Sequence, residues 1–282
     1  MAHVVCEKNA ATVIKSYSPN LMVHPYMRDT PSLTAQAKAS GVDASIVLKQ
    51  DIIPRILAFL PRLHVVVIGP GLGRDETMLE IVRAVIHRAK ELDLHIVIDA
   101  DGLFLVQNSP DVISGYKKAV LTPNVIEFQR LCKALDIVVP PSFPADDNVA
   151  QSTCHLLAQK LNGPTIIAKG KVDYISNGVS ELLCDMPGGL KRVGGQGDTL
   201  SGAMSTFLAW KCAYQSKLWS HDASLSDDRL MLLSAYGAAA VTRYSSRAAF
   251  AKYGRSMLAS NLSEMIGDAY KDLFEDHILA NI

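Results

Sequence analysis

Residues 64–69 read HVVVIG, residues 95–99 read HIVID, and the stretch between them, residues 75–92, reads DETMLEIVRAVIHRAKEL. The two short runs are almost continuously apolar, which is typical of parallel strands that are covered on both faces. In the stretch between them, apolar residues recur in steps of four and three, as one side of a helix requires. These residues are Met78, Val82, Val85, Ala89 and Leu92. The order strand, helix, strand predicts a crossover unit of a doubly wound α/β sheet.

The same strand signal occurs elsewhere in the chain. Short β-branched runs occupy residues 3–6, 21–24, 119–122 and 165–169. Residues 172–184 predict two strands joined by a hairpin turn at Asn177-Gly178. Helices are expected at about 198–214, 229–245 and 261–279, and exposed loops at 138–148 and 215–228. We therefore predict an α/β fold whose ligands bind beyond the carboxyl ends of the parallel strands.

The composition of the chain argues against several classes of binding partner. Lys plus Arg and Asp plus Glu are equal at 28 each, so no overall basic charge favours nucleic acid or an anionic membrane surface. The 5 cysteines are widely spaced and odd in number, which indicates reduced thiols rather than disulfides or a zinc site. No run is long and apolar enough to span a membrane. We predict a cytoplasmic protein that binds neither nucleic acid nor membrane, and leave open a mitochondrial form and a homo-oligomer.

A glycine-rich segment precedes one of the expected helices. Residues 194–203 read GGQGDTLSGA, and a helix that begins there directs N–H groups and the positive end of its dipole toward any anion. Asp198 lies at this helix start. An Asp in this position often caps the helix, so the segment alone leaves open whether Asp198 has a structural or a chemical role.

Two further segments follow predicted strands. Residues 69–76 read GPGLGRDE, in which Gly71 belongs to a glycine pattern like a dinucleotide-binding turn, but Arg74 stands where the third glycine of that pattern belongs. An ordinary strand-to-helix turn explains this segment equally well. Residues 99–102 read DADG, where Asp99 and Asp101 could hold magnesium-bound water. Capping of the next helix is slightly favoured for Asp101.

Two more polar segments lie at strand ends. Residues 122–128 read TPNVIEF, and we expect Thr122 to cap a helix with Pro123 as its first residue. That leaves Asn124 and Glu127 able to reach a ligand or a metal-bound water. Residues 169–173 read KGKVD and place Lys169 at the end of a strand, where a phosphate could bind.

Together these segments favour phosphoryl chemistry over a set of independent helix caps. If the amides of Gly195, Gln196 and Gly197 hold a transferring phosphoryl group, Asp198 lies beside the incoming hydroxyl and can accept its proton. Asp198 is then a general base.

The segments GGQGD, TPNVIEF and IGPGLGR, together with DADGL and KGKVDYISNG, resemble those of the ATP- or ADP-dependent NAD(P)H-hydrate dehydratases, a branch of the ribokinase-like superfamily. The resemblance runs from about residue 2 to about residue 275. It implies a ribokinase-like doubly wound, mostly parallel sheet flanked by helices. It also implies a hydro-lyase that repairs hydrated NADH or NADPH: a nucleotide phosphorylates the hydroxyl on the nicotinamide ring, and phosphate then leaves.

The resemblance also implies roles for individual residues. Asp198 is the base, the turn Gly194–Gly197 forms the anion hole, Glu127 helps to order Mg²⁺ through water, and the GQGD form favours ATP as the donor. Residues implied to contact the hydrated dinucleotide are Gly71, Asn124, Val125, Ile126, Glu127, Phe128, Gln129, Arg130 and Asp198. Residues implied to line the ATP side are Lys169, Gly170, Lys171, Val172, Asp173, Gly188, Gly189, Leu190, Lys191, Arg192, Val193, Gly194, Gly195, Gln196 and Gly197.

The front of the chain departs from the family pattern. Family members carry an earlier strand and helix before the stretch that matches HVVCEKNA, residues 3–10. We therefore expect residues 1–282 to form a single, N-terminally truncated domain that lacks the first strand-helix unit and exposes the edge of the strand at Ala2–Cys6. Two alternatives remain: a ribokinase-like kinase of a vitamin precursor, and a nucleotide binder without catalysis.

Overall fold

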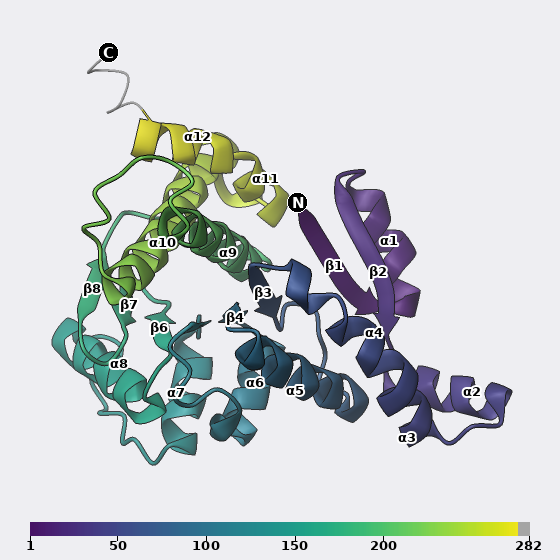
Figure 1. Cartoon of the computed structure of the whole chain (residues 1–282). Helices are drawn as coiled ribbons and strands as arrows, with labels where there is room; N and C mark the ends of the chain where they lie inside the picture. Colours follow the sequence, from purple (N-terminus) through teal and green to yellow (C-terminus); the bar gives the residue numbers. More distant parts are fainter. Residues whose placement is uncertain (276–282) are drawn as a thin grey trace. The chain divides into compact units, whose positions relative to one another are not determined.

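The computed structural model describes residues 1–275, which divide into two compact units (Figure 1). The first unit contains Met1–Leu63 and Gly71–Leu94. The second contains His64–Pro70 and the chain from His95 onward. Each unit is described by itself.

The first unit holds a two-stranded parallel sheet of β1 (Ala2–Glu7) and β2 (Leu21–Met27), drawn in purple in Figure 1. Ala2 pairs with Leu21, and the register shifts between Val5 and Glu7. Both strands were predicted, but as members of the main sheet, and the structure pairs them with each other in a sheet of their own. Pro25 lies within β2 and lacks the N–H that a central strand needs, which suits β2 to the edge of a sheet.

The helices of the first unit are short except for α2 and α5. They are η1 (Lys8–Ala10), α1 (Ala11–Tyr17), α2 (Thr30–Ser40), α3 (Ala44–Val47), the π-helical turn η2 (Leu48–Ile52), α4 (Ile53–Leu57), η3 (Leu60–Arg62) and α5 (Glu76–Glu91). The carboxylate of Asp75 caps α5 by accepting the Met78 N–H at 3.2 Å, and it also accepts the Thr30 N–H at 3.0 Å. One side chain thus ties the starts of α2 and α5 together. The predicted apolar stripe of α5 is confirmed, since all its residues but Leu92 are buried.

The second unit is built on a six-stranded sheet in the order β3-β4-β5-β6-β7-β8. Its strands are β3 (Val65–Ile68), β4 (His95–Ile98), β5 (Ala119–Leu121), β6 (Thr165–Ala168), β7 (Asp173–Ser176) and β8 (Glu181–Cys184). Neighbours from β3 to β6 pair in parallel, and β7 and β8 add an antiparallel hairpin. Every residue of β4 to β7 is buried. The prediction of a mostly parallel α/β sheet is therefore confirmed.

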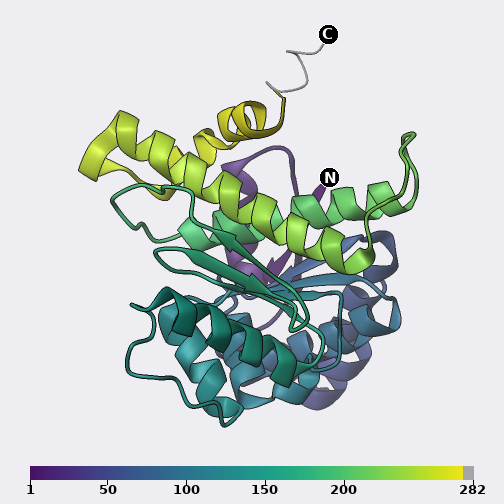
Figure 2. The same cartoon turned by 90° about the vertical axis from the view of Figure 1, so that its left-hand side faces the viewer.

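Helices cover both faces of this sheet. They are α6 (Asp101–Asn108), η4 (Pro110–Val112), α7 (Val125–Ala134), α8 (Asp147–Leu161), α9 (Gln196–Gln215), α10 (Asp227–Tyr253), η5 (Gly254–Ser256), α11 (Ala259–Glu264), α12 (Ile266–Tyr270) and the π-helical turn η6 (Lys271–Glu275). Helix α8, in teal, and helix α10, in yellow-green, lie on opposite faces of the sheet in Figure 2. On the α9 side, Leu200, Met204 and Leu208 pack against Val97 and Val120 of the sheet and complete the core.

The predicted helix boundaries hold in part. The helix expected at 229–245 continues to Tyr253 and ends at Gly254, whose φ of 56° breaks the helical backbone. The helix expected at 261–279 is divided into α11, α12 and a π-helical turn, and residues 276–279 lie outside the described part of the chain. Helix α8 was not anticipated, although Asp146 caps it by accepting N–H groups of Asn148 and Val149.

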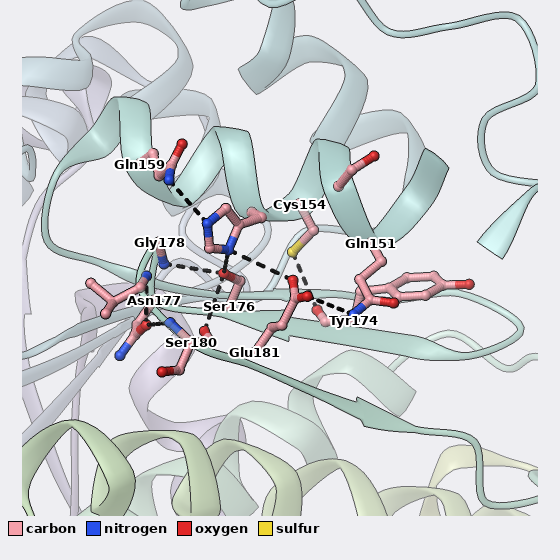
Figure 3. A network of polar contacts seen from close by, with 12 residues as sticks. Gln151, Cys154, Gln159, Tyr174, Ser176, Asn177, Gly178, Ser180 and Glu181 are labelled. Atoms are coloured by element: carbon pink, nitrogen blue, oxygen red, sulfur yellow. Dashed lines mark hydrogen bonds and ion pairs between the residues drawn. The ribbon is translucent and has the colours of Figure 1, made fainter. Parts of the chain in front are cut away.

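The β7-β8 hairpin is tied to α8 by a network of polar side chains (Figure 3). The predicted Asn177-Gly178 turn is present, with the Asn177 carboxamide accepting the N–H groups of Val179 and Ser180. Gln151 of α8 donates to Glu181 of β8 at 2.7 Å, and Ser176 Oγ accepts the Gly178 N–H at 3.1 Å (Figure 3). These bonds give α8 and the turn structural roles and hold the hairpin that begins at Asp173.

Two further expectations can be compared with the structure. The cysteines are all free, as predicted, and four of them, Cys6, Cys132, Cys154 and Cys184, are buried while Cys212 is half-buried. Among residues 1–275, no helix combines the length and apolar character that a membrane crossing demands.

Candidate functional site

A buried carboxylate lies just past the end of β4. Asp99 is only 2% exposed, and its Oδ1 accepts hydrogen bonds from Lys169 Nζ and the Ala100 N–H, both at 2.9 Å. Its Oδ2 accepts the Ser201 hydroxyl at 2.7 Å. Burial raises the pKa of Asp99, but Lys169 and the hydroxyls of Ser201 and Thr122 outweigh it and hold the pKa below its ordinary value. Asp99 is thus an ionised anchor for the β6 end and for α9.

Neither acid of the DADG segment caps α6. The N-cap residue is Ala100, which has a φ of 47° and makes no side-chain cap bond, and Asp101 is the first helical residue. The expectation that Asp101 caps the helix is therefore wrong, because the sharp turn after Asp99 starts the helix one residue earlier. Gly69 explains this turn in part: a Cβ there would lie 1.7 Å from the Asp99 carbonyl oxygen. The glycine lets the end of β3 pass directly against the DADG turn.

Helix α9 begins without a side-chain cap. Its N-cap residue is Gly195, which has a φ of 89°, and Asp198 lies in the first turn, with its N–H donating to the Gly195 carbonyl at 3.1 Å. The capping interpretation of Asp198 is therefore wrong. A Cβ on Gly197 would lie 3.3 Å from Asp99 Oδ2 and 3.4 Å from Lys169 Nζ. Glycine at this position lets the first turn of α9 lie directly over the Asp99–Lys169 ion pair.

The Asp198 side chain is exposed, yet its electrostatic surroundings disfavour its negative charge. Partial loss of water raises the pKa of Asp198, and the charge of Asp99 raises it further, while Lys169 opposes both effects. A carboxylate whose pKa is raised is a stronger proton acceptor than an ordinary one. The arrangement therefore suits a general base that faces solvent beside an uncapped helix start.

Two other predicted segments meet at the same edge of the sheet. The Lys169 N–H donates to the Pro123 carbonyl at 2.9 Å, which places KGKVD next to TPNVIEF. The Gly170 N–H donates to Asp173 Oδ1 at 3.0 Å and closes the turn between β6 and β7. Lys169 is only partly exposed, and its ammonium group lies between Asp99 and the start of α9. It can therefore offer positive charge to an anion bound at that helix start.

The cap of α7 differs from the prediction. Asn124 is the N-cap residue, and its side chain accepts the N–H groups of Ile126 and Glu127, both at 3.0 Å. Glu127 Oε2 accepts the Asn124 N–H at 2.8 Å and completes a capping box. The prediction that Thr122 caps this helix is wrong, because Asn124 with Glu127 three residues later forms the stronger capping pair. Thr122 is instead buried at the end of β5, with its hydroxyl 3.4 Å from the Ile98 carbonyl.

The remaining residues implied for the hydrated dinucleotide differ in exposure. Phe128 is fully buried and stacks on Phe143 with ring centroids 5.1 Å apart, so its side chain serves the core. Ile126 and Arg130 are exposed at the helix surface. Gly71 lies in the first unit, where its φ of 65° requires glycine. Their contacts with a ligand stay predictions.

The segment 188–197 is held by α10 and the chain that follows this helix. The Gly189 N–H donates to Ser246 Oγ at 3.3 Å. Lys191 Nζ donates to the carbonyls of Arg255 at 2.7 Å and Met257 at 2.8 Å, so its charge is used to fix this segment. Leu190 is 80% exposed. The segment therefore reaches the start of α9 along a defined path.

The carboxylates of this region can be tested for a magnesium ion. Among the residues the structure describes, no group of three or more His, Cys, Asp or Glu side chains could hold a metal. Both oxygens of Asp99 are already engaged, and one oxygen of Glu127 serves the capping box. Mg²⁺ is often held by one or two carboxylates with water and substrate phosphates. The residues fit an ion that arrives with a nucleotide better than a resident one.

Comparison with solved structures defines the class of fold. A hypothetical protein from Streptococcus mutans is similar with a TM-score of 0.66 at 20% identity, covering 97% of this chain and 80% of that one. A ribokinase-like superfamily protein from Enterococcus faecalis is similar with a TM-score of 0.65 at 19% identity, covering 96% and 76%. With its mostly parallel sheet flanked by helices, the chain has a ribokinase-like α/β fold.

The chain belongs to the NAD(P)H-hydrate dehydratase family, because the model of that family matches residues 1–268. The ATP-dependent (S)-NAD(P)H-hydrate dehydratase of Schizosaccharomyces pombe is 46% identical, covering 98% of this chain and 79% of the relative. The protein of the same name from Neurospora crassa is 45% identical, covering 97% and 79%.

Proposed function

We propose that this protein is an ATP-dependent NAD(P)H-hydrate dehydratase, a hydro-lyase that converts (S)-NAD(P)H-hydrate and ATP into NAD(P)H, ADP and phosphate. Membership of the family and a relative at 46% identity support this activity. The observation that carries it is the exposed Asp198, whose pKa is raised, at the uncapped start of α9 and above the Asp99–Lys169 pair.

In the first step, Asp198 accepts the proton of the hydroxyl on the hydrated nicotinamide ring while that oxygen attacks the terminal phosphorus of ATP. ADP leaves with the electrons of the broken bond. The Gln196 N–H is engaged with the Val193 carbonyl at 3.3 Å, so we assign the migrating group to the N–H groups of Gly195 and Gly197. Lys169 adds positive charge beside them.

In the second step, the lone pair of the ring nitrogen expels phosphate from the adjacent ring carbon, and loss of a proton from the next ring carbon to water restores the double bond. Hydroxide is a poor leaving group and phosphate a good one, so the spent nucleotide makes the elimination feasible without strong acid. Mg²⁺ bound to the nucleotide phosphates would neutralise charge there, with Glu127 and water as its protein-side contacts.

We further propose how the two ligands divide the site. The hydrated dinucleotide takes the side of Asn124–Arg130, and ATP takes the side of Lys169–Asp173 and Gly188–Gly197. We also propose that both compact units act as one domain, which the single family match over residues 1–268 supports. The free cysteines support a cytoplasmic location, and a homo-oligomer stays open.

The activity is tested with purified protein, hydrated NADH and ATP. We expect the absorbance of NADH to rise, with one ADP and one phosphate released per NADH. Asp198→Asn should lower kcat by about 10² to 10⁴ because the base is lost, without loss of fold by circular dichroism. Asp111→Asn, an exposed acid in η4, is the matched control and should keep full activity. Unchanged kcat in Asp198→Asn would remove that residue from its role.

The kinase alternative gives a different product. A kinase accumulates a phosphorylated substrate, whereas a dehydratase releases inorganic phosphate. Similarity to hydroxyethylthiazole kinase from Pyrococcus horikoshii, with a TM-score of 0.57 at 18% identity over 77% of this chain and 75% of that one, concerns the fold alone. It therefore does not favour the kinase.

A further inference from the structure

Arg243 lies in the middle of α10, and its side chain is 11% exposed. Its guanidinium group forms a two-pronged ion pair with the carboxylate of Asp173, with Nε 2.7 Å from Oδ2 and Nη2 2.8 Å from Oδ1. Such a fork matches the planar geometry of a carboxylate and is stronger than a single contact. The pair joins α10 to the first residue of β7.

The other N–H groups of Arg243 reach backbone carbonyls. Nη2 donates to Gly170 at 3.0 Å, and Nη1 donates to Lys171 at 2.9 Å and to Met186 at 3.1 Å. All five donors of the guanidinium group are therefore used. One side chain holds two segments that are separate in the sequence: the turn after β6 and the chain that leads from β8 to α9.

The same helix holds the second segment again, one turn farther on. Ser246 Oγ accepts the Gly189 N–H at 3.3 Å. A Cβ on Gly189 would lie 2.5 Å from the Ser246 carbonyl oxygen, so the segment lies directly against α10. The face of α10 that carries Arg243 and Ser246 is thus a common support for both segments assigned to ATP.

We infer that Arg243 is a positioning residue for the ATP side of the site, an inference that rests on the proposed function. By fixing the carbonyls of Gly170 and Lys171, it sets the direction of the turn that also carries Lys169. By holding Met186, it fixes where the segment 188–197 leaves the sheet. A site that is ordered before the nucleotide arrives loses less entropy on binding. Arg243 therefore contributes to ATP affinity without touching ATP.

The test is Arg243→Lys in the full chain, with the Kd for ATP measured by calorimetry in the presence of Mg²⁺. Lysine keeps the charge but cannot make the fork or reach all three carbonyls. We expect the Kd for ATP to rise about ten- to a hundredfold, because two or more hydrogen bonds that order the turn are lost. The KM for hydrated NADH should change by less than about twofold. Arg247→Lys, an exposed arginine one turn along α10, is the matched control and should leave both values unchanged.

A second variant covers the case in which Arg243→Lys fails to fold. Ser246→Ala removes the acceptor of the Gly189 N–H with little change in volume, and we expect about a threefold rise in the Kd for ATP. Unchanged ATP affinity in folded Arg243→Lys, or in Ser246→Ala if the first variant is unfolded, overturns the inference, as does wild-type protein that binds no ATP. Wild-type protein that binds ATP but does not convert hydrated NADH refutes the proposed function. In that case the Kd for ATP of Arg243→Lys still decides whether Arg243 positions the ATP side.

Discussion

An ion pair with one buried partner lies near each end of β4, and helix α9 contributes to both. At the carboxyl end, Asp99 is paired with Lys169 and bonded to Ser201 in the first turns of α9. Near the amino end, Lys211 of the same helix is paired with Asp227 at 2.5 Å. The buried partner is the acid in the first pair and the base in the second: the side chain of Asp99 is 3% exposed and that of Lys211 is 0% exposed.

What surrounds each pair is different. The Asp99–Lys169 pair lies under an uncapped helix start with an exposed acid, Asp198, whose pKa is raised. Near the Lys211–Asp227 pair lies His95, which is 2% exposed and whose Nδ1 has no hydrogen-bond partner within the part of the chain that the structure describes. An ion pair with one buried partner therefore does not by itself mark a site. What distinguishes the Asp99–Lys169 pair is the acid beside it, Asp198, which is exposed to solvent and whose pKa is raised.

The largest expected effect comes from removing the more exposed partner of each pair. Lys169→Met leaves Asp99 buried without its cation, and Asp227→Asn leaves Lys211 buried without its anion, so each should lower the free energy of unfolding by about 3–5 kcal/mol. Asp99→Asn and Lys211→Met should cost less, because Lys169 and Asp227 can turn toward water. Urea unfolding of the four variants measures these differences. Equal costs for both partners of a pair would show that burial does not set the asymmetry.

The next effect concerns His95 and pH. Burial, with the charges of Lys211 and Lys118, lowers the pKa of His95 from 6.5 to about 4. Between these two values the unfolded chain binds a proton at His95 that the folded chain does not, so the contribution of His95 to stability is present above about pH 6.5 and is lost as the pH drops toward 4. The full difference corresponds to about 3 kcal/mol.

This pH dependence is measured as the free energy of unfolding in urea at about pH 7 and about pH 4.5. We expect His95→Gln to show a smaller loss between the two conditions than the wild type. The control is His87→Gln, since the side chain of His87 is 78% exposed in α5. An unchanged loss in the His95 variant would mean that other groups cause it. Asp99 and Asp227 act at lower pH, because their pKa values lie below 3.8.

The smallest effect compares two glycines of α9. Gly202 has no atom within 4 Å of an added Cβ, so Gly202→Ala should raise the free energy of unfolding by about 0.4–1 kcal/mol. Gly197→Ala adds the same methyl group 3.3 Å from Asp99 Oδ2 and should lose this gain. It should also lower the rate of NADH formation, because the methyl group pushes on the ion pair. Thermal unfolding and the NADH assay separate the two effects. Equal stabilisation by both variants would mean that the first turn of α9 accommodates the added methyl group without displacing Asp99.

The main sheet could be predicted from the sequence because its strands are short, continuous apolar runs. The apolar character of each residue in such a run indicates that its side chain is buried. The partner of a strand is set by contacts far away in the sequence, so the separate β1-β2 sheet could not be predicted. For α8 the signal was present: Ala150, Cys154, Leu157 and Leu161 follow the helical period behind Asp146.

The candidate site shows the same division. The segments around Asp198, Lys169 and Asn124 could be found because glycines, caps and acids have local signatures. Arg243 could not be found, since its partner Asp173 is 70 residues away and nothing near it in α10 indicates an ion pair. Ser201 lies one helical turn after Gly197, which by itself indicates a functional role only weakly. Its role becomes clear from the structure, in which its hydroxyl donates to Asp99.

The burial of four cysteines has a chemical consequence. Burial raises the pKa of the Cys132 thiol to about 12 and that of Cys184 to about 11, so almost none of either is thiolate near neutral pH. Peroxides and alkylating reagents attack the thiolate, and they find these sulfurs both protonated and out of reach. The packing of the sheet and its helices thus protects these two thiols from oxidants.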